Sequence, residues 1–270
     1  MNVQKLFLCG FALCYTLLTH ADQPIMNMMP RWDGGYGWQA LYERIDRDDL
    51  LQGSETFRSG WYERIEQLHV QGVYTWDRSI RLTVKVPIVL EAERVNWVAG
   101  ERVVQKDSGL GDITVALPLK KYFNLMKRTG SWTLAPQLRI PVDGADEYEV
   151  YDGAWGGGLF AGYETETRAY FFACGVAYWA FEGQEPEEWH ASLDLGWNVH
   201  DHVQLLWESD GHYETNGKEL VSMGPALYWR FKDEIHSRIE YKRSISAKAP
   251  NNQVDHVGGE KISLGIGFVY

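Results

Sequence analysis

Hydrophobic and polar residues alternate with a period of two along most of this chain, which is typical of β-strands with one apolar and one polar face. In the segment 80–90, for example, Ile80 and Leu82 alternate with Arg81 and Thr83. Seven further segments alternate in the same regular way: 113–120, 132–140, 189–199, 203–208, 221–231, 235–245 and 262–270. We therefore predict a strand in each of them.

Four more segments alternate less regularly, because glycine and alanine blur their two faces: 36–46, 60–76, 153–163 and 168–181. With these included, the sequence predicts about twelve strands. The stretch 169–181 is apolar on both faces, so its pattern leaves the register of that strand open.

The connections between the predicted strands also alternate. Four are short (77–79, 164–167, 200–201 and 232–233), and the polar stretches between them are longer: 47–59, 93–109, 141–152, 182–187, 214–218 and 247–257. Bacterial outer-membrane barrels join their strands by short periplasmic turns and longer outer loops. The pattern thus predicts an even number of strands with both termini in the periplasm. The connection 122–130 is an exception, being long where a short turn is expected.

Composition places this sheet in a membrane. The chain has 12 Trp and 15 Tyr, yet its mean hydropathy is −0.34. A transmembrane barrel reconciles the two, because only alternate residues face lipid. Lipid offers the backbone no hydrogen-bond partner, so a sheet in the membrane must close on itself. The predicted fold is all-β: a closed, transmembrane, antiparallel β-barrel of about twelve strands in the outer membrane.

Aromatic residues near the predicted strand ends, such as Trp76, Trp132, Trp189 and Tyr241, are expected to form the girdles found at both membrane interfaces. The alternative is ordinary core packing in a soluble sandwich or a lipocalin-like barrel, since those folds share short alternating strands.

The first residues have the layout of a secretory signal peptide, in which Lys5 precedes an apolar run over 6–18 and a small-residue cleavage site at Ala21. We predict a signal peptide over 1–21, a periplasmic segment over 22–35 and the barrel over 36–270. Cleavage there would leave Cys174 as the only cysteine, so no internal disulfide and no cysteine-based metal site are expected.

The last predicted strand ends in alternating hydrophobic residues with Phe268 and Tyr270 at its close. This ending resembles the signal by which the outer-membrane assembly machinery recognises its clients. We therefore expect that machinery to be a partner of the chain.

Short motifs connect the chain to a known family. The stretch Gly109-Leu110-Gly111-Asp112-Ile113-Thr114 resembles the glycine-aspartate hallmark of the MetA-pathway of phenol degradation family. The hairpin around 77–87 and the strand end at Pro141 resemble other parts of that family, although Pro141 is followed by Val-Asp-Gly where Pro-Thr-Gly is usual. The resemblance covers roughly 67–270. It implies an outer-membrane barrel that transports aromatic or hydrophobic compounds.

Asp112 of this motif has two interpretations. It could bind a ligand, or it could be a turn residue whose carboxylate accepts backbone hydrogen bonds. The turn role is favoured, because aspartate is common in turns for that reason.

A twelve-stranded lumen is intermediate between the filled eight-stranded barrels and the wide porins. The polar faces of the predicted strands direct ten charged residues into it: Arg81, Lys85, Lys120, Arg139, Asp194, Glu208, Arg230, Arg238, Glu240 and Lys242. Rows of opposite charge can create a field across a pore and set its selectivity. The same residues can equally neutralise one another in salt bridges that fill the lumen.

The main functional hypothesis is passage of small molecules across the outer membrane. One competing class is a lipid hydrolase, for which His190 and Ser192 on one strand face are the nearest nucleophile and base pair. Those two residues face inward, away from lipid, so we predict no enzymatic activity. A third class is a closed structural or adhesion barrel with acidic loops such as 143–152 and 183–188.

Charge and motifs limit the partners. The formal net charge of −11 argues against a nucleic-acid partner, for which a basic patch is expected. No loop has the spacing of a recognised calcium site. The expected partners are therefore membrane lipid and a small-molecule solute, with no cofactor and no metal.

Overall fold

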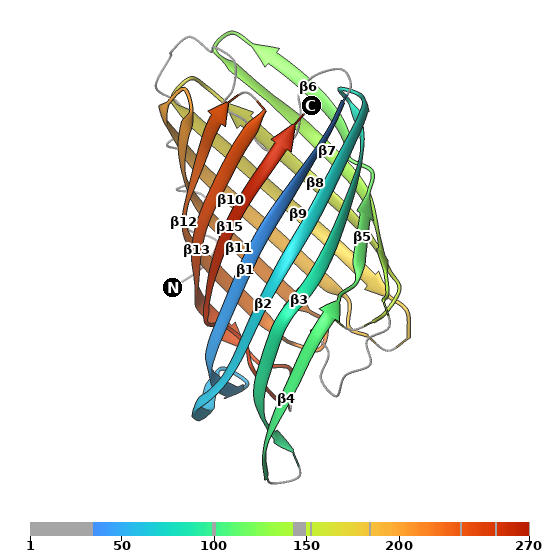
Figure 1. Cartoon of the computed structure of the whole chain (residues 1–270), viewed down its shortest axis with the longest axis vertical. Coiled ribbons are helices and arrows are strands. Elements are labelled where there is room, and N and C mark those ends of the chain that lie inside the picture. Colours follow the sequence, from blue (N-terminus) through green and yellow to red (C-terminus); the bar gives the residue numbers. More distant parts are fainter. Residues whose placement is uncertain are drawn as a thin grey trace.

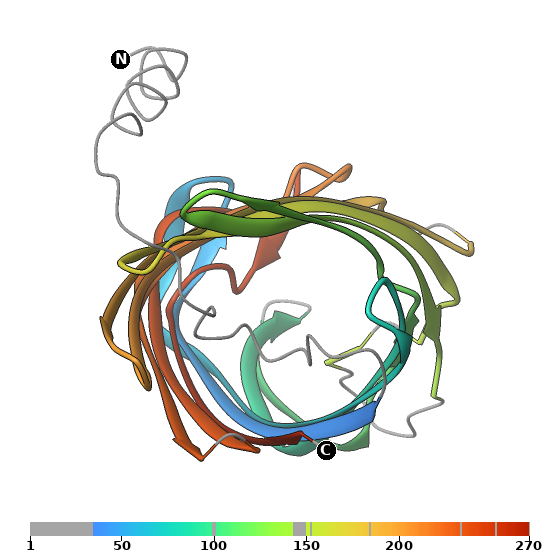
Figure 2. The same ribbon diagram turned by 90° about the horizontal axis from the view of Figure 1, so that it is seen from above.

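The computed structural model describes residues 35–98, 101–142, 150–151, 153–183, 185–232, 234–251 and 253–269. The strands form one sheet that closes into a barrel (Figures 1 and 2). Among the described residues, no helix is long and apolar enough to cross a membrane. The predicted signal peptide 1–21 lies outside the described residues, and so does the predicted segment 22–35 except for Gly35, which begins the first strand.

Within the described residues, fifteen stretches of strand make up the sheet. They are β1 (Gly35–Gln52), β2 (Glu55–Asp77), β3 (Ile80–Val98), β4 (Glu101–Leu110), β5 (Ile113–Ala116), β6 (Leu119–Leu125), β7 (Arg128–Ile140), β8 (Gly156–Glu166), β9 (Tyr170–Phe181), β10 (Glu188–His200), β11 (Val203–Glu214), β12 (Glu219–Lys232), β13 (Ile235–Lys248), β14 (Val254–Asp255) and β15 (Glu260–Val269).

Twelve barrel strands result from these stretches, as the alternation predicts. The elements β4, β5 and β6 follow one another along the same neighbour, β3, and so form one interrupted strand of the wall. The two-residue β14 adds a short pairing to β1. Closure is made by β1, which pairs antiparallel with β2 on one side and with β15 on the other.

The two ends of the barrel differ. One end, here named the turn end, has the connections 78–79, 126–127, 167–169, 201–202 and 233–234. The other, the loop end, has 53–54, 99–100, 141–155, 182–187, 215–218 and 249–259. In Figure 1 the turn end is at the top and the loop end at the bottom.

Three predicted connections were wrong. The segment 122–130 is mostly strand, since β6 continues to Leu125 and β7 begins at Arg128. Only Met126 and Lys127 form the turn between them, with Lys127 in a left-handed conformation (φ 72°). The polar stretches 47–59 and 93–109 are largely strand, since the β1–β2 and β3–β4 hairpins extend past the other strands (Figure 1). Strands outside the bilayer need no apolar face, so polarity there indicates solvent rather than a loop.

The outward surface is apolar in the middle of the wall. Large hydrophobic side chains such as Leu193, Leu195 and Trp197 are exposed, while Asp194 and Asn198 on the other face of the same strand point inward and are partly buried. Trp76 and Trp132 face outward toward the turn end and Trp189 toward the loop end, as expected of girdles. Tyr241 also faces outward, but it lies near the middle of β13.

The outward face becomes charged on the long hairpins. Arg44 and Arg64 each contact Asp46 at 2.7 Å, and Arg44 also lies 3.6 Å from Glu66. These ion pairs are on the outside of the wall, because their strand neighbour Ile45 packs inward against the cluster of Ile65. Lipid therefore ends below this level, and the tips of β1–β4 project beyond it.

Candidate functional site

A cavity of about 360 Å³ lies in the lumen toward the loop end. Its wall combines charged, histidine and small residues from eight strands and one connection: Glu43, Ile45, Arg47, Phe160, Gly175, Ala177, His190, Ala191, Ser192, Asp210, Gly211, His212, Leu220, Ser222, Lys242, Ser244, Gly258, Gly259, Glu260 and Lys261. Charged and polar side chains reach this wall because, at the level of the lipid, the apolar residues of the strands face outward.

One face of the cavity rests on a network of carboxylates and cations, here named the lumen network (Glu43, Glu208, Asp210, Arg238, Glu240, Lys242 and Lys261). The Nη2 atom of Arg238 lies 2.6 Å from Oε2 of Glu208 and 2.5 Å from Glu240. The Nζ atom of Lys242 lies 3.0 Å from both of these carboxylates and also contacts Asp210.

Small residues on β12 make this network possible. Glu208 is on β11 and Arg238 is on β13, so the intervening strand separates them. The register neighbours of Glu208 and Glu240 on β12 are Gly224 and Ala226. Because these two carry little or no side chain, the long side chains of β13 can cross over β12 to reach Glu208.

The structure thus brings together four of the predicted lumen residues: Glu208, Arg238, Glu240 and Lys242. Asp194 lies beside them, since it pairs in register with Glu208. Glu43 and Lys261 complete the network with an ion pair of 3.5 Å.

Two of the predicted cations of the first half of the chain, Lys120 and Arg81, have partners outside the lumen network. Lys120 forms a 3.0 Å ion pair with Glu164, which also accepts a hydrogen bond from Ser131. Arg81 is fully buried and donates to the hydroxyl of Tyr122 at 2.7 Å.

Two further predicted cations have different surroundings. Lys85 lies on β3, opposite Gln71 and Thr114 in register. Arg230 is at the turn end, where it contacts the ring of His202 and the carbonyl oxygen of Asp201. Arg230 therefore lies at the rim, away from the predicted constriction.

The side chain of Arg139 extends across two neighbouring strands and contacts two aromatic rings on the way. Its guanidinium lies 4.4 Å from the ring centre of Phe181 and 5.2 Å from that of Trp179, and its Nη2 atom is 3.5 Å from Glu188. The rings lie flat on β8, where a methyl group at Gly156 or Gly158 would come within 2.6 Å of them. The glycine run of β8 is thus space for these rings.

Phe160 is held in the same way at the cavity wall. Its ring covers Gly162 and Gly175, and a methyl group at either glycine would come within 2.6 Å of it. A large residue at these glycines would push the ring into the lumen. The glycines therefore keep the cavity wide while leaving an aromatic surface on its wall.

The glycine-aspartate motif anchors the β7–β8 connection inside the barrel. A methyl group at Gly111 would overlap the ring of Tyr151, whose hydroxyl donates to Gln67 at 2.8 Å. Asp112 is 2% exposed, and its Oδ1 atom accepts the backbone N–H of Val142 at 3.2 Å. The Asp112 carboxylate thus accepts a backbone hydrogen bond, as expected of a turn residue, but the N–H group comes from the β7–β8 connection and not from its own turn.

The other motif residues lie around this anchor. Gly109 is the penultimate residue of β4 and has φ 130°, a backbone conformation that favours glycine. Pro141 follows the last residue of β7. In the closing strand, Phe268 stacks on Trp38 at 4.7 Å across the β1–β15 seam. Tyr270 and most of the predicted acidic loop 143–152 lie outside the described residues, so the assembly signal stays a prediction.

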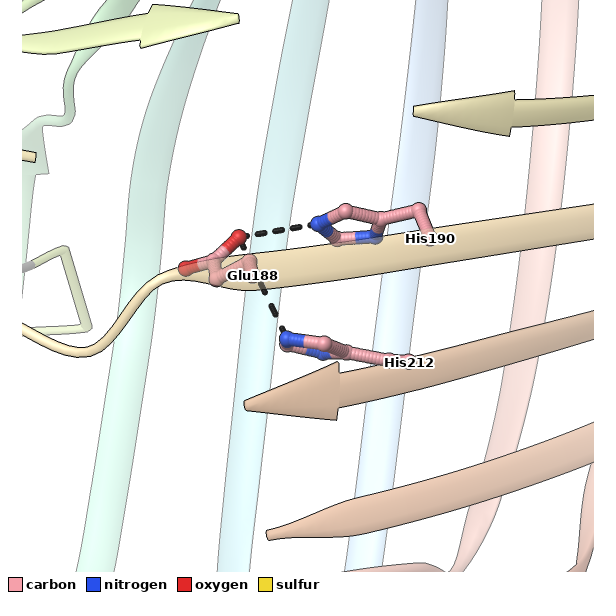
Figure 3. A group of neighbouring side chains, drawn as sticks. All are labelled: Glu188, His190 and His212. Carbon is pink, nitrogen blue, oxygen red and sulfur yellow. Dashed lines mark hydrogen bonds and ion pairs between the residues drawn. The ribbon is translucent and has the colours of Figure 1, made fainter. Parts of the chain in front are cut away.

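His190 has a different partner from the one considered for catalysis. Its Nε2 atom is 2.8 Å from Glu188, and its ring stacks on His212 with 4.5 Å between centroids. Figure 3 shows both imidazole rings directed at the Glu188 carboxylate. Ser192 lines the same cavity, next to Gly175.

Sequence reasoning missed several of these residues, namely Glu43, Glu164, Glu188, His212 and Lys261. Each of them occupies one of the alternate positions of its strand that face the lumen. Continuing the alternation to the strand ends therefore identifies them as lumen residues. The pairing of glycine with a ring on the next strand needs the register, which alternation alone does not supply.

A closed antiparallel barrel with an apolar outer wall and a polar lumen defines a transmembrane β-barrel of outer-membrane type. No protein-family model and no curated protein sequence matches the chain, so its resemblance to the MetA-pathway family stays a prediction.

Solved barrels of this class are similar in structure. The COG4313 outer membrane channel from Pseudomonas putida F1 superimposes with a TM-score of 0.71 at 13% identity, over 93% of this chain and 98% of that one. The KdgM porin in complex with oligogalacturonate has a TM-score of 0.52 at 8% identity, over 87% and 99%. The NanC porin has 0.50 at 11%, over 86% and 98%. At such identities, the likeness shows the fold alone.

Proposed function

We propose that the protein is an outer-membrane channel that passes small molecules. The loop end faces the exterior and the turn end faces the periplasm, because bacterial barrels have their short turns on the periplasmic side. The apolar belt between the two ends contacts lipid, and the charged hairpins of β1–β4 stand in water outside it.

The observation that carries this proposal is the cavity of about 360 Å³ within the lumen. A structural barrel gains stability by filling its interior with side chains. Here the glycines at 162 and 175 let Phe160 lie against the wall instead. This arrangement leaves the interior less well packed and leaves room for a solute. It therefore supports a channel over a closed structural or adhesion barrel.

The lumen network is expected to make this channel weakly selective for ions. Its carboxylates (Glu43, Glu208, Asp210 and Glu240) face cations of nearly equal number (Arg238, Lys242 and Lys261), so their fields largely cancel. Charged residues lining a narrow part of a pore set its selectivity. Removing one carboxylate will therefore shift the preference toward anions.

Conductance in planar lipid bilayers tests the channel. The refolded protein is expected to give discrete current steps. Asp210→Asn removes a carboxylate that lines the cavity, so its reversal potential in a salt gradient is expected to indicate a greater preference for anions. Glu66→Gln is the matched control, because Glu66 pairs with Arg44 on the outside of the wall. Stable insertion without current steps would contradict the proposal and favour a closed barrel.

The solutes we propose are small molecules with an aromatic or apolar part. Phe160 gives the cavity an aromatic surface on one side, while Asp210 and Lys242 line it with charges. Such a cavity suits an amphipathic solute, which gains apolar contact without losing hydration of its polar group.

Anion flux into proteoliposomes tests the solute class. The ratio of benzoate to acetate permeability is expected to fall in Phe160→Ala, although the wider lumen raises both rates. Phe181→Ala is the control, since the ring of Phe181 lies on β8 beneath Arg139 rather than on the cavity wall. An unchanged ratio in Phe160→Ala would exclude an aromatic solute contact at this position.

A further inference from the structure

Two strands place four potential metal ligands on one patch of the lumen wall. On β10, Glu188 and His190 are two residues apart, and on β11 so are His212 and Glu214. The register pairs His190 with His212 and Glu188 with Glu214. Because residues two apart share a face and paired residues are neighbours, the four side chains form a square that faces the lumen.

Three of these side chains converge. The Nε2 atom of His190 lies 2.8 Å from Oε2 of Glu188, and the Nε2 atom of His212 lies 3.9 Å from the same oxygen. All three ligand atoms are within 4.8 Å of one another. Tetrahedral Zn²⁺, bound at about 2.0–2.1 Å, separates its ligand atoms by about 3.3–3.4 Å. Small side-chain rotations bring this group to that spacing.

His212 provides an independent sign of a ligand. Among the described residues, its buried Nε2 atom has no hydrogen-bond partner, although it points at Glu188 (Figure 3). Glu214 lies 3.6 Å from the same nitrogen and can supply a fourth ligand atom. The imidazole rings of His190 and His212 stack with 4.5 Å between their centroids, which keeps the two histidines close together.

We propose that Glu188, His190 and His212 bind a divalent transition-metal cation such as Zn²⁺, Cu²⁺ or Ni²⁺. Imidazole and carboxylate together suit these ions, whereas Mg²⁺ and Ca²⁺ prefer oxygen ligands alone. Both histidines line the cavity, so the ion enters from the lumen and exchanges with solution.

Neighbouring cations limit the affinity. Arg139 lies 3.5 Å from Glu188, and Lys218 lies 3.4 Å from Glu214. A metal ion must compete with both for the carboxylates. The site therefore fits reversible binding rather than a permanent structural metal.

Calorimetric titration of the tag-free refolded protein with ZnCl₂ in detergent tests this site. We expect one Zn²⁺ per chain, with affinity lowered at least tenfold by His190→Ala and by His212→Ala. His200→Gln is the matched control, because His200 lies at the turn end beside His202 and outside the cluster. Zinc binding that is absent, or that survives both substitutions unchanged, would overturn the proposal.

A second measurement needs no substitution. Cu²⁺ added to the refolded wild-type protein is expected to give an electron paramagnetic resonance spectrum with hyperfine coupling to two imidazole nitrogens. A spectrum with coupling to no nitrogen or only one would contradict the site. Neither measurement depends on whether the lumen conducts, so failure of the channel proposal and failure of this one are distinguishable.

Discussion

Replacing Glu208 by glutamine removes one negative charge from the centre of the lumen network and keeps the size of the side chain. Glu208 is 3% exposed. It accepts two contacts from Arg238, at 2.6 and 2.7 Å, and one from Lys242 at 3.0 Å. The amide oxygen of glutamine can replace only part of these contacts, and it carries no charge.

The expected cost follows from the partners that remain. Removing one member of a buried ion pair typically destabilises a protein by about 3–5 kcal/mol, because the other charge stays buried. Arg238 and Lys242 still contact Glu240, at 2.5 and 3.0 Å. We therefore expect the lower end of the range, a loss of about 3 kcal/mol in the free energy of unfolding.

Denaturant unfolding in phospholipid vesicles, followed by tryptophan fluorescence, measures this change. Glu219→Gln is the control, because Glu219 forms a 3.3 Å pair with Lys248 while 46% of its side chain is exposed. Exposed pairs contribute about 0–1 kcal/mol, so this variant should stay close to wild type. Equal effects of the two substitutions would refute the inference that the lumen charges depend on one another.

Two further predictions concern the loop end. Gly111→Ala is expected to displace the Tyr151 ring and to destabilise the barrel by about 1–3 kcal/mol, the usual cost of overpacking. The same denaturant titration measures this change. A loss below about 0.5 kcal/mol, the size of a neutral surface substitution, would contradict the expected displacement. His256 is 1% exposed, and burial lowers the pKa of its imidazole, so protonation favours the unfolded chain. Stability should therefore fall as the pH drops below about 6.5. His256→Gln should reduce that fall, and an equal fall in both proteins would contradict it.

The wall of the barrel could be predicted from the sequence because lipid contact imposes a strict period. Segments such as 80–90 and 189–199 must present an apolar residue at every second position, so their faces and the closed fold follow. The strand count follows for the same reason. Outside lipid this constraint ends. There the extended hairpins of β1–β4 carry ion pairs such as Arg64–Asp46 on their outer face, and their polarity resembles that of a loop.

The lumen could be predicted only in part. The alternation of polar and apolar positions identifies which charged residues point inward. It correctly placed Glu208, Arg238, Glu240 and Lys242 on the lumen side. Which of them meet depends on stagger between strands and on the side chains between, such as the small Ala226. The cluster of Glu188, His190 and His212 could not be predicted for the same reason. Its residues come from two strands, and the sequence pattern does not fix the register between them.

Cysteine modification tests most directly whether the cavity lies on the path of the solute. Cys174 is first replaced by serine, and cysteine is then placed at Ser192, which lines the cavity, or at Leu193, which faces lipid. A charged, membrane-impermeant methanethiosulfonate reagent is added during single-channel recording. We predict that Ser192→Cys loses a large part of its current on modification and that Leu193→Cys keeps its current. Complete modification of Ser192→Cys with no change in current would mean that the cavity is not on the path of the solute.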